Sequence, residues 1–171
     1  MKKLYLIFLF DLAILSLSAQ TDTLTKTKIV IGLSAPELLH LGINVDLSKW
    51  NQLGISAGVG PSWGQAWPTL SLEQRFYFGN IGELTNRRKW FFRQSGTWFP
   101  AGKEGAGTLT LGIDFKSKHP NRGWTIDAGV FDLFRNRRDY KNLLYPALRF
   151  QYYSYFKKSK AALKIHLLLI S

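Results

Sequence analysis

Cysteine is absent from the chain, and residue patterns that carry a recognisable chemistry are few. Without Cys there is no disulfide, no thiolate metal ligand and no lipid anchor attached through Cys. The three histidines, His40, His119 and His166, show no metal-ligand spacing with one another or with a carboxylate. No glycine-rich phosphate motif precedes a helix, so the sequence predicts neither a cofactor nor a nucleotide site.

Long apolar runs are also missing, except at the start of the chain. After a basic beginning, an apolar run extends from residue 4 to residue 17 and is followed by Ser18, Ala19 and Gln20. This order is typical of a secretory signal peptide, so we expect residues 1–19 to be removed. An uncleaved anchor is the alternative, but Asp11 lies within the run, and a carboxylate is costly inside a bilayer.

Helical periodicity is unconvincing before the C-terminal tail, and a two-residue alternation takes its place. In residues 69–79 apolar side chains hold the even positions, broken only by Gln74, and polar side chains hold most of the odd ones. A β-strand sends alternate side chains to opposite faces, so this pattern predicts a strand with one apolar and one polar face. The strands expected on this basis are residues 29–34, 39–48, 53–60, 69–79, 90–99, 108–116, 124–131 and 148–156.

About eight strands of roughly ten residues are long enough to cross a bilayer when tilted. Their short connections make neighbours antiparallel. Residues 61–68, with a proline at each end, are expected to form one of the loops. The predicted fold is all-β: a closed antiparallel up-and-down transmembrane β-barrel over residues 20–156. For the tail, residues 157–171, three alternatives stay open: a periplasmic segment, an extra strand or a reading-frame artefact.

Alternation alone does not say which face is inside. The polar face carries many glycines, which relieve crowding inside a narrow barrel but weaken an exposed sheet. It also carries charges of both signs, and each Arg would cost roughly 2–4 kcal/mol facing lipid at mid-bilayer. We therefore expect the polar face inside, with a mixed salt-bridge network. Its charged members are Asp46, Glu73, Arg75, Arg93, Asp114, Asp127 and Arg149.

Tryptophan placement agrees with that choice. The chain has six Trp, and numbering the strands alternately up and down puts them at the strand ends. Two aromatic girdles suit a bilayer-spanning barrel, because the indole ring is apolar with one N–H for the headgroup zone. The expected girdles are Trp50, Trp90 and Trp124 at one rim, and Trp63, Trp67 and Trp98 at the other.

Together, residues 17–20, 34–39, 72–79 and 146–151 resemble the small eight-stranded outer-membrane barrels of the OmpA/OmpX type. The likeness is greatest to small outer-membrane barrel proteins common in Bacteroidota, and it covers nearly all of the mature chain. The resemblance implies residence in the outer membrane with periplasmic termini, and it implies no known activity. Such barrels usually end on an aromatic residue; Phe156 fits that position, but residues 157–171 follow it.

The resulting prediction is a structural or interaction protein of the outer membrane, not an enzyme, with a lumen filled by side chains and no open pore. One alternative is a lipid- or small-ligand-binding barrel with a cavity beside His40 or Trp63. Another is a barrel lipid hydrolase built on Ser34, His40 and Glu37.

The net charge of +12 and the basic runs at residues 87–89 and 135–138 bear on partners. They favour lipopolysaccharide or phospholipid phosphates over nucleic acid, which a secreted chain rarely meets. A solvated loop face is the plainer interpretation of both runs. We expect a monomer.

Overall fold

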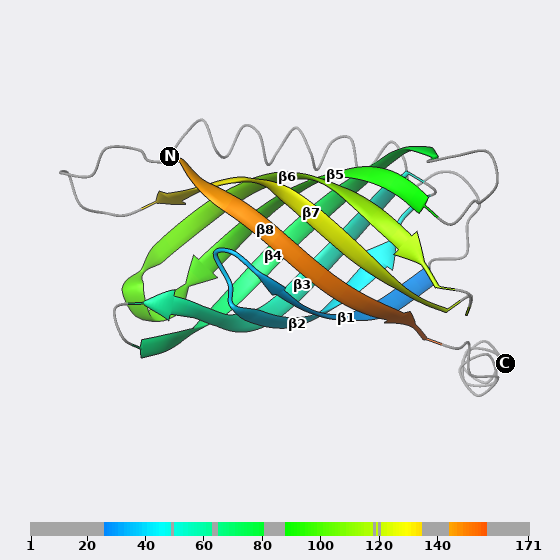
Figure 1. Cartoon of the computed structure of the whole chain (residues 1–171). Helices are drawn as coiled ribbons and strands as arrows, with labels where there is room; N and C mark the ends of the chain where they lie inside the picture. Colours follow the sequence, from blue (N-terminus) through cyan, green and yellow to red (C-terminus); the bar gives the residue numbers. More distant parts are fainter. Residues whose placement is uncertain are drawn as a thin grey trace, which may run out of the picture.

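The computed structural model describes residues 26–48, 50–62, 65–80, 88–117, 119, 121–134 and 144–156. Eight strands run obliquely around a closed antiparallel barrel in which each pairs with its neighbours in sequence and β1 pairs with β8 (Figure 1). The strands are β1 (Lys26–Ser34), β2 (Leu39–Asp46), β3 (Asn51–Ser62), β4 (Gln65–Asn80), β5 (Arg88–Phe99), β6 (Glu104–Lys116), β7 (Arg122–Phe134) and β8 (Leu144–Tyr155). The predicted up-and-down barrel of eight strands is confirmed.

A short 3-10 helix, η1 (Pro100–Gly102), joins β5 to β6. No helix in the described part of the chain is long and apolar enough to cross a membrane. The expected signal peptide, residues 1–19, and the tail, residues 157–171, lie outside the described residues.

The predicted loop at residues 61–68 is wrong. β3 and β4 extend through both prolines, with Val59 opposite Pro68 and Pro61 opposite Ala66. Proline is tolerated where its nitrogen faces an unpaired edge. The pairing of β4 with β5 begins only at Leu70, so Pro68 lies beyond the end of that ladder.

The two faces of the barrel wall differ in polarity. Six hydrophobic residues are buried among the described residues, against twenty-one polar or charged ones. Large exposed hydrophobic side chains have the opposite parity on the strands, as Leu109 and Leu111 do on β6; Tyr145 near the start of β8 is an exception. The inside of the barrel is therefore mostly polar and the outside mostly apolar, the reverse of a water-soluble β-barrel.

Glycines inside the wall stand where neighbours leave no room. A Cβ on Gly112 would lie 2.5 Å from both Asp127 Cβ and Phe91 Cζ. A Cβ on Gly96, whose parity is outward, would meet nothing within 4 Å. Close packing thus belongs to the interior side of the wall.

Because the strand number is even, β1 begins and β8 ends at the same end of the barrel. We call this end the terminal rim. It also contains the chain reversals after β2, β4 and β6. The opposite rim contains η1 and the chain reversals after β1, β3 and β7.

Candidate functional site: the charged interior

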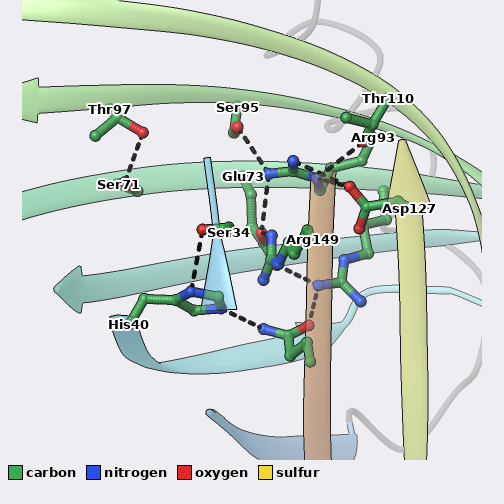
Figure 2. A network of polar contacts seen from close by, with 12 residues as sticks. Ser34, His40, Ser71, Glu73, Arg93, Ser95, Thr97, Thr110, Asp127 and Arg149 are labelled. Carbon is green, nitrogen blue, oxygen red and sulfur yellow. Dashed lines mark hydrogen bonds and ion pairs between the residues drawn. The ribbon is translucent and has the colours of Figure 1, made fainter. Parts of the chain in front are cut away.

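Glu73 is the centre of the interior. It lies on β4 between the inward-facing Ser71 and Arg75 and is almost fully buried. One carboxylate oxygen accepts a hydrogen bond from Arg75 at 2.9 Å and from Asn44 Nδ2 at 2.7 Å. The other pairs with Arg149 and lies 3.8 Å from Arg93 Nη1 (Figure 2).

Asp127 supplies the second carboxylate of this group. Its Oδ1 lies 3.1 Å from Arg93 Nη2 and 3.2 Å from Arg93 Nε. Arg93 also donates to Thr110 Oγ1 at 3.1 Å and to Ser95 Oγ at 2.9 Å. Five residues on four strands therefore form one ion-pair network, which we call the Glu73 cluster: Glu73, Arg75, Arg93, Asp127 and Arg149.

Buried charge is balanced over the described residues. Four cations and four carboxylates are buried: Lys28, Arg75, Arg93 and Arg149, with Glu37, Glu73, Asp114 and Asp127. A buried charge without a partner costs several kcal/mol. The formal charges of these eight buried residues therefore sum to zero.

Gln151 joins the Glu73 cluster to the opposite rim. Its Oε1 accepts from Arg75, and its Nε2 donates to His40 Nε2 at 3.2 Å. Because Nε2 of His40 accepts, the ring proton lies on Nδ1. That nitrogen donates to Ser34 Oγ at 3.3 Å, and Ser34 donates to Glu37 Oε2 at 3.3 Å.

The three residues considered for a hydrolase are thus in contact, but in an order unlike a catalytic triad. In a triad the imidazole lies between serine and acid, with one nitrogen facing each. Here Ser34 and Glu37 both lie on the Nδ1 side of His40, while Gln151 occupies Nε2. His40 is only 1% exposed. The geometry fits a hydrogen-bonded interior histidine better than a catalytic base.

Glu37 is held differently from Glu73. It belongs to the β1–β2 connection, which turns into the mouth of the barrel. Its Oε1 accepts from Ser71 and, at 3.5 Å, from Thr69 Oγ1. Together with Ser34, three hydroxyl groups stabilise this carboxylate where Glu73 has guanidinium groups.

Asp114 and Asp46 were expected in the same network but lie nearer the terminal rim. Asp114 accepts from Tyr153 at 2.7 Å and from Tyr77 at 3.3 Å. Asp46 accepts from Tyr155 at 3.1 Å and from the side-chain amide of Gln52. Phenol groups and one amide, rather than the arginines of the Glu73 cluster, are the contacts described for these two carboxylates.

Lys28 is an interior cation that the sequence reasoning missed. It is fully buried, and its Nζ lies 4.2 Å from the ring centroid of Tyr153 and 5.6 Å from that of Tyr155. Its parity is that of the inward-facing Val30, so alternation carried the signal. The expected strand began one residue too late, at Ile29, and left Lys28 out.

Among the described residues, four tryptophans are exposed, each near one rim. Trp50, Trp90 and Trp124 are exposed near the terminal rim, and Trp98 is exposed near the opposite rim. Trp67 has the same parity as the inward-facing Thr69 and Ser71 of β4, and it lies beside Gly102 of η1. It is therefore not on the outward face. Trp63 lies outside the described residues.

A small polar group interrupts the apolar outer face. Gln74, the residue that broke the alternation of β4, donates to Asn51 Oδ1 at 3.3 Å. Gln94 on β5 donates to Gln74 Oε1 at 3.0 Å. These amides have outward parity, and they satisfy one another across three strands.

No protein-family model and no curated protein matches the chain. Among solved structures, the N-terminal β-barrel domain of OprF from Pseudomonas aeruginosa is similar, at 9% sequence identity and a TM-score of 0.46. The match covers 75% of this chain and 96% of that one. The barrel fold rests here on strand pairing, not on this match. The likeness to Bacteroidota barrels stays a prediction.

Proposed function

We propose that the chain is a structural or interaction protein of the outer membrane, an eight-stranded barrel that neither conducts ions nor catalyses a reaction. The observation that carries the proposal is the reversed polarity of the wall. Leu111 is 49% exposed on the outside, while Arg75 is 0% exposed on the inside. In water this arrangement would expose a wide apolar surface; in a bilayer the same surface meets lipid.

The packed interior supports a closed lumen. The largest fully buried side chains include Arg75, Lys28, Gln52 and Gln151, which come from four different strands. Long polar side chains that cross a narrow barrel and bond to one another leave no continuous water path. In planar bilayers the purified barrel should give no stable conductance. Large, ion-selective channels would contradict the proposal.

Location and closure can be tested together. We expect the chain to fractionate with the outer membrane after removal of residues 1–19, and its gel mobility to change on boiling, as a closed barrel requires. Lipopolysaccharide and other outer-membrane lipid are the expected partners, with the barrel as a monomer. Recovery in the soluble periplasmic fraction would contradict the proposal.

Contact among Ser34, His40 and Glu37 makes lipid hydrolysis the second candidate, despite the order of the three groups. Purified barrel should not deacylate phospholipid or lipopolysaccharide. Deacylation that disappears in Ser34→Ala and His40→Gln, with the heat-modifiable band intact, would favour the hydrolase instead.

A further inference from the structure

Exposed charge is of one sign among the residues that the structure describes. In the part of the chain that the structure describes, the exposed charged side chains are Lys26, Lys103, Lys116 and Arg122. Every carboxylate there is buried or half-buried. The balanced interior therefore coexists with a cationic surface, and three of the four exposed cations lie at the terminal rim.

Those three cations form an arc. Lys116 ends β6 opposite Gly123, and Arg122 begins β7 opposite Ser154 of β8. Lys26 begins β1, which is the other neighbour of β8. One cation thus lies on each of three strands along the consecutive sequence β6, β7, β8, β1. Arg122 has outward parity, whereas Lys116 and Lys26 have the inward parity of Asp114 and Lys28.

The position of Arg122 is fixed by backbone hydrogen bonds. Its N–H donates to the carbonyl of His119 at 3.2 Å, and its carbonyl accepts from Ser117 at 3.0 Å. The carbonyl of Asn121 accepts from Tyr155 N at 2.8 Å. The guanidinium therefore extends from a bonded strand end, not from a long loop.

An aromatic platform lies directly below Arg122 on the outer face. Trp124 has the same outward parity and follows two residues later, about 7 Å along the strand. Its ring stacks on Phe150 with centroids 4.9 Å apart and contacts Tyr152 at 4.6 Å. Indole rings prefer the depth where lipid headgroups meet acyl chains. A cation one step outside that depth is level with the lipid phosphates.

We propose that this surface, formed by Arg122, Trp124 and Phe150, binds an anionic glycerophospholipid. The phosphate would accept hydrogen bonds from Arg122, and the acyl chains would lie over Trp124 and Phe150. Arginine is suited to this because its planar fork can donate two parallel hydrogen bonds to one phosphate. The inference rests on the proposed function, since it requires a barrel within a bilayer.

We assign the lipid-binding surface to the terminal rim because the described part of the opposite rim carries a different set of charges. Lys103 is its exposed cation, Glu104 follows it directly as a half-buried carboxylate, and Asp132 near the end of β7 is a second half-buried carboxylate. Residues 135–143, between β7 and β8, lie outside the described residues and add four basic residues by sequence. They require a control of their own.

The test uses the full barrel reconstituted in phosphatidylcholine bilayers that contain phosphatidylglycerol with brominated acyl chains. Quenching of tryptophan fluorescence gives the association of phosphatidylglycerol relative to phosphatidylcholine. We expect a preference of at least several-fold that falls with added salt. Arg122→Gln should reduce it about fivefold, while Arg122→Lys should retain much of it. Lys116→Gln removes a cation of inward parity at the same rim and should leave the preference unchanged.

Two matched variants remove charge elsewhere: Lys103→Gln, and Arg137→Gln combined with Arg138→Gln. Both should leave the phosphatidylglycerol preference unchanged. No preference in the parent barrel, or an equal loss in either control, would overturn the inference. The heat-modifiable band shows that each variant is folded. If the parent barrel enters bilayers without a lipid preference, only this inference fails; if it enters no bilayer, the proposed function fails as well.

Discussion

The inner and outer faces of the same strands obey opposite rules. On β4, Glu73 and Arg75 face inward and are buried in ion pairs, while Leu70 and Leu72 face outward and are exposed. A single residue step therefore separates a charged environment from an apolar one. The difference teaches that this wall is stabilised from inside by specific polar contacts, and that its outside needs only to be compatible with lipid.

Specific contacts should be sensitive to substitution, and a fluid environment should not be. An arginine that loses its carboxylate stays buried and unpaired. A leucine that is shortened on the lipid side leaves a gap that acyl chains can fill. Matched substitutions on the inner and outer faces should therefore differ in their effect on the free energy of unfolding.

The largest effect should come from Glu73→Ala. It removes the shared acceptor of Arg75, Arg149 and Arg93, and breaking a buried ion pair costs about 3–5 kcal/mol. Leu72→Ala, one residue away on the outer face, should cost much less. Urea unfolding in detergent micelles, followed by tryptophan fluorescence, measures both. Equal losses of unfolding free energy in the two variants would contradict the distinction between the two faces.

A smaller effect is expected from Gly112→Ala. The new methyl group would collide with Phe91, Asp127 and the Ile126 carbonyl, and overpacking typically costs about 1–3 kcal/mol. Gly96→Ala on the outer face meets nothing within 4 Å and should be close to neutral. Gly112→Ala should therefore lower the free energy of unfolding more than Gly96→Ala does. A greater loss at Gly96 would argue against the packing described.

The smallest effect should follow Gln74→Leu. It removes two amide hydrogen bonds, each contributing about 1 kcal/mol net, but places an apolar group among the apolar side chains of outward parity. Gln151→Leu makes the same change inside and leaves Arg75 and His40 without their partner. Refolding yields and urea midpoints should show Gln151→Leu as clearly worse. The reverse order would mean that the outer amides stabilise more than the inner ones.

Alternation predicted the fold well because each face of the wall meets one kind of environment. A strand such as β6 can then be identified from Leu109, Leu111 and Ile113 alone. Strand ends were predicted less well, because a local rule about proline could not show that the ladder with β5 stops before Pro68.

Which interior side chains contact one another was harder to predict than which side chains face inward. Charge and parity placed Glu73, Arg75, Arg93, Asp127 and Arg149 on the polar face. They could not show that Asp46 and Asp114 accept hydrogen bonds from tyrosines instead, since side chains from strands that are not direct neighbours meet inside the barrel. Neutral groups such as Gln151 carry no charge signal, although this one joins two parts of the network.

The face assignment is the central claim, and one pair of variants tests it most directly. Unfolding of Arg75→Ala and Leu111→Ala should be measured in the same phospholipid bilayer. Arg75 is fully buried and bonded to Glu73, and Leu111 is half exposed on the outer face. We expect Arg75→Ala to lose about 3–5 kcal/mol and Leu111→Ala much less. If Leu111→Ala is the worse of the two, the apolar face is the core and the barrel is a water-soluble one.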